Sequence, residues 1–124
     1  MKQVDKIDFF RILEEMTSSR GEIELLIMLA LIRLGPDAYG VPIAREIEST
    51  ARRSVALASI YATLERLEER GLTESRLGEA THERGGRAKR YFQITAAGLQ
   101  DVRSRRASLV RMWSGVRQLE GGQA

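Results

Sequence analysis

Apolar side chains recur at helical spacing along most of the chain and alternate with polar ones in two short stretches. In the clearest helical stretch, Ile60, Leu64 and Leu67 form one apolar stripe at spacings of four and three residues. The alternating stretches predict strands over residues 72–77 and 90–94, separated by a long polar tip. The chain is therefore expected to be mostly α, in the α+β class, with helices over residues 1–17, 21–34, 40–50, 59–70 and 96–119.

Local signals define several of the expected helix ends. Gly71 is free to adopt the left-handed conformation of a C-cap, so it should end the helix of residues 59–70. Thr95 is a capping residue for the last helix. The helix of residues 21–34 is apolar nearly all round from Leu25 onward, and we expect it at the centre of the core.

The side of the 59–70 helix opposite the apolar stripe carries Ser59, Ala62, Thr63 and Arg66. Short hydroxyl side chains near the N-terminus of a helix suit close approach to base edges in a DNA major groove. An ordinary amphipathic surface helix is the alternative, and this segment alone leaves both interpretations open.

Composition and charge help to choose between a DNA-binding helix and an ordinary surface helix. The 124 residues fit one compact domain, and the absence of Cys excludes disulfides and thiolate sites and fits a reducing cytoplasm. The longest apolar run is too short to span a bilayer, and we expect a cytoplasmic protein. The net charge is only +3, but residues 1–50 carry a net −3 and residues 51–124 a net +6. The cationic half contains the candidate DNA-facing helix, as nucleic-acid binding requires.

The second half of the polar tip, residues 84–90, holds four cations and no acid. Its two glycines let the backbone approach another surface closely. We expect these cations to meet DNA phosphates or to enter a minor groove. The alternative is a solvated loop, although such loops usually mix both signs of charge.

The last expected helix has an apolar stripe longer than its own domain needs, and a second copy of the chain is the partner that we expect to cover it. Arg105 and Arg106 interrupt the stripe, and acidic residues of the first helix such as Glu14 and Glu15 are candidate partners for them. The stripe consists of Leu99, Val102, Leu109, Met112, Trp113, Val116 and Leu119.

Helices, a recognition helix and a basic hairpin follow one another in the order of a winged helix-turn-helix domain. The helix of residues 40–50, the turn at 51–55 and the helix from about residue 58 form the helix-turn-helix, and the hairpin is a two-stranded β-wing. We expect three parts: an N-terminal dimer helix (1–18), the DNA-binding domain (19–95), and a C-terminal dimerisation helix with a frayed tail (96–124).

Motifs between about residues 22 and 100 carry a family resemblance. They are Leu25-Leu-Ile-Met-Leu-Ala30 with Tyr39-Gly40, Ser59-Ile-Tyr-Ala-Thr-Leu-Glu-Arg-Leu-Glu-Glu-Arg-Gly-Leu72, Glu83-Arg-Gly-Gly-Arg87, Lys89-Arg-Tyr91 and Ile94-Thr-Ala-Ala-Gly98. In this order and spacing the sequence resembles the PadR family of transcriptional regulators, in its branch with one short C-terminal helix. The resemblance implies a homodimeric, sequence-specific DNA-binding repressor, and several members release DNA when a small aromatic or drug-like ligand binds.

Carried over position by position, the family's DNA contacts fall on Ser59, Tyr61 and Thr63 of the recognition helix and on Arg87, Lys89 and Arg90 of the wing. In this motif the Tyr61 hydroxyl would donate to a phosphate. A half-buried aromatic beside the core stripe is the other interpretation of Tyr61, and the two are compatible.

Two further DNA-binding candidates come from the helical pattern. Arg66 lies on the same helix face, and Tyr39 at the start of the preceding helix either touches the DNA backbone or packs beneath the turn. One position departs from the family, because Ala56 replaces the usual capping residue. Ser54 or Ser59 would compensate, or the helix begins slightly later, which shifts the base-facing residues by about one position.

Trp113 is the only tryptophan and lies on the last helix's apolar stripe. In a dimer, two indoles would stack a flat aromatic ligand, as in some drug-sensing family members, with Phe9, Phe10 and Met112 lining the same space. Core packing in the dimer seam is the alternative role.

Rival functions have weaker support. No nucleophile motif, phosphate loop or metal-spaced cluster is present, and His82, the single histidine, lies in the polar tip, so neither an enzyme nor a cofactor is expected. A winged-helix module for protein–protein assembly would have an acidic or neutral wing and a bulky apolar recognition face, and this sequence has the reverse of both. A membrane-surface role would need an amphipathic helix that combines basic and exposed aromatic residues, and none is seen.

Overall fold

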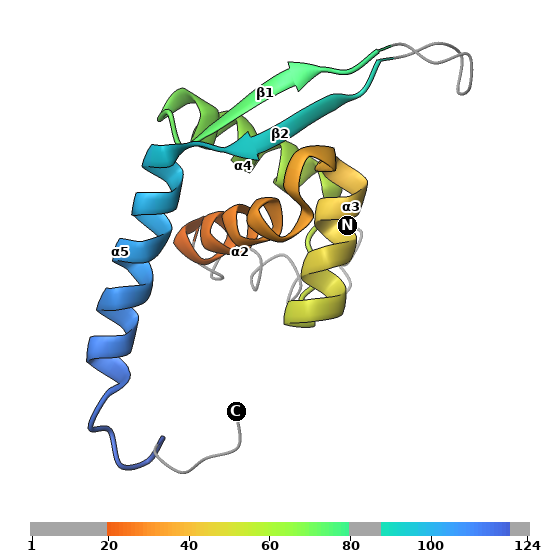
Figure 1. Ribbon diagram of the computed structural model, residues 1–124. Coiled ribbons are helices and arrows are strands. Elements are labelled where there is room, and N and C mark those ends of the chain that lie inside the picture. Colours follow the sequence, from red (N-terminus) through yellow and green to blue (C-terminus); the bar gives the residue numbers. More distant parts are fainter. Residues whose placement is uncertain (1–19, 80–87, 120–124) are drawn as a thin grey trace, which may run out of the picture.

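The computed structural model describes residues 20–79 and 88–119 (Figure 1). The expected first helix and the outer part of the polar tip lie outside these residues. The elements in chain order are α2 (Arg20–Leu34), the 3-10 turn η1 (Gly35–Asp37), α3 (Gly40–Glu46), the π-helical turn η2 (Ile47–Ala51), α4 (Leu57–Glu69), β1 (Thr73–Leu77), β2 (Arg90–Ile94) and α5 (Ala96–Trp113).

Helices α2, α3 and α4 pack together, the β1–β2 hairpin lies across one side of α4, and α5 runs away from the hairpin past α2 (Figure 1). The core takes its side chains from every one of these elements except β1, and it includes Ile27, Met28, Leu31, Ile43, Ile60, Leu64, Leu67, Phe92 and Val102. The fold is mostly helical with one two-stranded sheet, so the expected winged helix-turn-helix class is confirmed.

Helix α2 is central, as expected, but it is not buried all round. Ile27, Met28 and Leu31 are enclosed, whereas Leu29 and Ile32 on the other side are about two-fifths exposed. No helix among residues 20–79 and 88–119 is long and apolar enough to cross a membrane.

Helix α4 ends as the sequence predicts and begins earlier than expected. Gly71 has a φ of +75°, and the Leu72 amide donates to the Leu67 carbonyl, which is the geometry of a Schellman cap. The first helical residue is Leu57, and Ala56 is the N-cap with no side-chain hydrogen bond. The expectation of a compensating serine cap or a later start is therefore wrong.

The hairpin is antiparallel, with Thr73 opposite Ile94 and Leu77 opposite Arg90, which confirms both predicted strands. The Phe92 amide donates to the Ala38 carbonyl at 2.8 Å, so β2 also pairs with the segment that joins α2 to α3. Because the Phe92 side chain is buried in the core, the base of the wing is fixed to the helices.

Helix α5 begins as predicted and ends early. The Thr95 hydroxyl accepts from the Gly98 amide at 3.0 Å, so the expected cap is confirmed. The helix ends at Trp113 rather than near Leu119, because Ser114 leaves the helical conformation and Gly115 has a φ of +79°. The early turns pack on α2 and β2, while the later turns stand clear of the core (Figure 1).

A buried carboxylate joins three of the helices. Glu24 of α2 is only 7% exposed and accepts hydrogen bonds from Arg70, at the end of α4, and from Arg105 of α5, each at 3.0 Å. Burial alone would raise the pKa of Glu24, but the hydrogen bonds and charges of the two arginines outweigh it and hold that pKa below its ordinary value. Arg105 also pairs with Asp101. The acids of the first helix that were expected to pair with it lie outside the described residues, so that pairing stays a prediction.

Candidate nucleic-acid interface

Helices α3 and α4, joined by η2 and residues 52–56, form the helix-turn-helix. Arg52, which follows the π-helical turn, adopts the left-handed conformation with a φ of +57° and so redirects the chain into the turn. Arg53 in the same turn pairs with Glu22 of α2 at 2.8 Å and ties the turn to the core. These contacts set the orientation of α4.

The outward face of α4 consists of Ala58, Ala62, Glu65 and Glu69, which follow one another at spacings of four, three and four and are all exposed. It lies opposite the buried stripe of Ile60, Leu64 and Leu67. This outward face is the part of α4 that is free to enter a DNA groove.

Thr63 does not belong to the outward face, so its expected placement opposite the apolar stripe is wrong, and its base contact stays a prediction. Its side chain is 1% exposed, and its hydroxyl accepts from the Arg66 guanidinium at 3.1 Å. Ser59 and Arg66 are half-buried on the same flank of the helix. The exposed side of α4 is therefore rotated about the helix axis relative to the expected one.

Tyr61 lies on the other flank and is 46% exposed. Its ring covers Gly40 at the start of α3, where a methyl group would lie 2.3 Å from the phenol oxygen. The ring is thus packed against α3, as one interpretation held. The phosphate contact of the hydroxyl, the other interpretation, stays a prediction.

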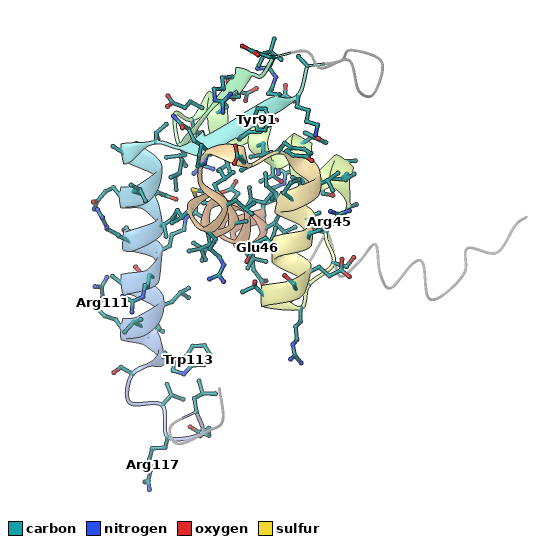
Figure 2. The ribbon with its side chains drawn as sticks, turned by 45° about the vertical axis from the view of Figure 1, so that its right-hand side comes forward. Arg45, Glu46, Tyr91, Arg111, Trp113 and Arg117 are labelled. Atoms are coloured by element: carbon teal, nitrogen blue, oxygen red, sulfur yellow. The ribbon has the colours of Figure 1, made fainter. Side chains whose placement is uncertain are left out.

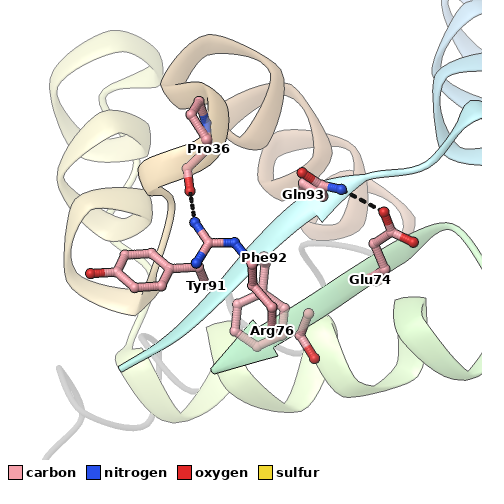
Figure 3. A pocket seen from close by; sticks show the side chains of 7 residues that line it. Pro36, Glu74, Arg76, Tyr91, Phe92 and Gln93 are labelled. Carbon is pink, nitrogen blue, oxygen red and sulfur yellow. Dashed lines mark hydrogen bonds between the residues drawn. The ribbon is translucent and has the colours of Figure 1, made fainter. Parts of the chain in front are cut away.

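Cations and aromatic rings alternate at the base of the wing. The Lys89 ammonium lies 4.3 Å from the centre of the Tyr39 ring and donates to its hydroxyl at 3.2 Å. Tyr39 meets Tyr91 edge to face at 5.7 Å, and the Arg76 guanidinium lies 4.8 Å from the Tyr91 ring centre. Figure 3 shows Arg76 also donating to the Pro36 carbonyl. This stack fixes Lys89 relative to the start of α3.

Arg90 is held by a chain of hydrogen bonds that runs through β1 to α4. Its guanidinium donates to the Ser75 hydroxyl at 3.0 Å, and Ser75 donates to the Glu68 carboxylate of α4 at 3.1 Å. An open groove between α4 and the wing is lined by Tyr61, Glu65 and Arg90, among others. The wing base and the recognition helix therefore face one shared groove.

Of the expected DNA-binding residues, the structure brings together Tyr39 with Lys89, and Tyr61 with Arg90, while Arg87 lies outside the described residues. Glu65 and Ala58, which the structure exposes on the outward face of α4, were not among the expected residues. A signal for them was present, because the face opposite Ile60, Leu64 and Leu67 is centred on these positions rather than on Thr63.

The family model for PadR-like transcriptional regulators matches residues 28–104, which include the helix-turn-helix, both wing strands and the start of α5. The chain belongs to the PadR-like family. Members of this family are transcriptional regulators and not enzymes.

Solved structures of PadR-like proteins resemble the chain over most of its length. A PadR-like transcription factor from Bacteroides fragilis is 25% identical, with a TM-score of 0.69 over 88% of this chain and 98% of its own. A transcriptional regulator from Clostridium thermocellum has a TM-score of 0.67, covers 82% of this chain and 92% of its own, and at 23% identity shows the shared fold alone. A protein from Lysinibacillus sphaericus of unassigned function is 28% identical over 102 residues, 81% of this chain and 85% of that protein.

The PadR-like resemblance also suggested an effector site, and two of its residues lie on α5. Met112 is 78% exposed. Trp113, which is 59% exposed, lies at the end of the helix, away from the core (Figure 2). Leu109 and Val110 beside them are more than half exposed. Phe9 and Phe10, the other two candidates, lie outside the described residues.

Proposed function

We propose that this protein is a homodimeric repressor that binds operator DNA sequence-specifically, with the outward face of α4 in the major groove and the wing base on the backbone. The observation that carries the proposal is the shared groove, in which exposed Tyr61 of α4 lies across from Arg90 of β2. A winged helix needs both elements on one side, because the helix reads base edges while the wing holds phosphates.

The charge of the wing supports its proposed contact with phosphates. Lys89 and Arg90 place two cations where the wing leaves the core, and the sequence has two more, Arg84 and Arg87, just before them. The outward face of α4 has no bulky apolar residue, which is what a protein-assembly module would need. Phosphate contact by the wing is therefore favoured over a protein partner.

Dimerisation would cover the end of α5. Leu109, Met112 and Trp113 share one side of the helix at spacings of three and one, and all are more than half exposed. Exposed apolar patches of this kind mark interaction sites, and a symmetric pair of α5 helices would bury them against each other. A flat aromatic effector between the two Trp113 rings would then act on the dimer.

Fluorescence anisotropy with DNA from upstream of the protein's own gene tests the proposal. We expect tight binding to this DNA and much weaker binding to a scrambled duplex of equal length, at several salt concentrations. Titration with planar aromatic compounds should release the specific complex. Equal affinity for both duplexes would contradict sequence-specific binding, and specific binding that no such compound affects would remove the effector from the proposal.

A further inference from the structure

We propose that Glu65 determines operator sequence by accepting a hydrogen bond from the amino group of a cytosine in the major groove. This inference rests on the proposed function and concerns what the recognition helix reads. Its starting point is the outward face of α4, which the structure defines as Ala58, Ala62, Glu65 and Glu69.

Only two of these four side chains, Glu65 and Glu69, can form hydrogen bonds. They lie at different distances from the N-terminus of the helix. Glu69 is the last residue of α4 and adjoins the cap at Gly71. Glu65 lies one turn earlier, directly after the alanines at 58 and 62. Because a recognition helix presents its N-terminal and middle residues to the bases, Glu65 is the hydrogen-bonding group of this face that comes nearest to base edges.

The Glu65 carboxylate is free to take a new partner. Glu68 beside it accepts from Ser75 of the wing, and Glu24 and Glu46 are held by arginines. Within residues 20–79 and 88–119, Glu65 has no hydrogen-bond or ion-pair partner, and it lines the groove that faces the wing. In a complex with DNA, this carboxylate loses water and needs a donor to replace it.

The chemistry of the bases selects cytosine. An ionised carboxylate only accepts hydrogen bonds. In the major groove guanine offers two acceptors and adenine offers an acceptor next to its amino group, and both repel a carboxylate. Cytosine offers its amino donor alone, and glutamate or aspartate is the side chain that pairs with it. The methyl groups of Ala58 and Ala62 suit thymine methyls at neighbouring positions.

Selection from a random duplex library by the full-length protein tests this inference, with Glu65→Gln and Glu69→Gln as matched variants. Each variant removes one carboxylate from the same face, so both should strengthen binding to non-specific DNA to a similar degree. Only Glu65→Gln should change the sequence that is selected, from cytosine to adenine at one position of each half-site, because glutamine both donates and accepts.

Competition between two duplexes that differ at this base pair gives the size of the effect. The wild-type protein and Glu69→Gln should prefer the cytosine duplex by roughly 5- to 150-fold, and Glu65→Gln should lose this preference. A selected motif that is identical for the wild-type protein and Glu65→Gln would overturn the inference while leaving specific DNA binding intact. No enriched motif for the wild-type protein would overturn the proposed function itself, and the inference with it.

Discussion

The phenol ring of Tyr61, from α4, lies over Gly40, the first residue of α3. A methyl group at position 40 would lie 2.3 Å from the Tyr61 oxygen and 2.5 Å from the adjoining ring carbon. Gly40 is therefore needed because it has no side chain, and not for backbone freedom. The contact holds Tyr61 at the edge of the groove that we assign to DNA.

Replacing Gly40 by alanine should disturb its contact with the Tyr61 ring. Gly40→Ala should lower the free energy of unfolding by about 1–3 kcal/mol, although alanine is the better helix former, because the methyl group overlaps the ring. In a Tyr61→Ala background the same change should cost much less, and urea unfolding of the four proteins gives the coupling. An equal cost in both backgrounds would show that Tyr61 is not the cause.

The sequence predicted the helices and strands well, but it predicted less well which side of a helix is buried. The strands, the Gly71 cap and the Thr95 cap depend on neighbouring residues, so local patterns were sufficient. Thr63 was misplaced because its short polar side chain looks suited to DNA, whereas the packing of α4 on the other helices buries it. The end of α5 was misplaced because the apolar pattern continues past Ser114 although the helix does not.

The partners of Glu24 were beyond prediction for a different reason. Arg70 and Arg105 lie 46 and 81 residues away along the chain, and only the fold brings them together. No local pattern distinguishes them from the other arginines. The same holds for Lys89 and Tyr39, which were predicted separately as DNA-binding residues and are in fact in contact.

Loss of the Glu24 carboxylate should destabilise the helical core. Glu24→Gln removes the charge that Arg70 and Arg105 share and should lower the free energy of unfolding by about 1–3 kcal/mol. Glu46→Gln is the matched control, since Glu46 also binds an arginine but lies at the surface, and it should have a smaller effect. Equal effects of the two substitutions in urea unfolding would contradict a special role for the buried group.

The same carboxylate should make stability depend on pH. Because folding lowers the pKa of Glu24, its contribution is complete above the pKa of an unfolded glutamate, about 4.3, and is lost as the pH falls below that value. Unfolding measured between about pH 7 and pH 3 should therefore show a smaller loss of stability in Glu24→Gln than in the wild-type protein. Parallel curves would contradict this assignment.

Lys89 should contribute to DNA affinity but not to sequence preference. Lys89→Gln should weaken binding to all duplexes alike and reduce the slope of log affinity against log salt by about 1. Arg103→Gln, which removes an exposed cation from α5, should leave the slope unchanged. If Lys89→Gln instead altered sequence preference at a constant slope, the wing would be reading bases or groove shape.

The end of α5 should hold the dimer together. Trp113→Lys should shift sedimentation equilibrium from dimer to monomer, because it puts a charge among the exposed apolar side chains of the helix. Leu77→Lys is the control, since Leu77 is 62% exposed but lies on β1. A Trp113→Lys protein that remains dimeric would place the interface elsewhere.

Entry of the outward face of α4 into the DNA can be tested with a single substitution at its centre, Ala62→Glu. Ala62 is exposed, so the change should leave thermal unfolding unaltered while it puts a third carboxylate at the centre of the face. Anisotropy with upstream DNA should show a loss of at least about tenfold in affinity, whereas Ser104→Glu on the exposed side of α5 should bind as the wild-type protein does. Wild-type affinity of the Ala62→Glu protein would show that α4 does not face the DNA.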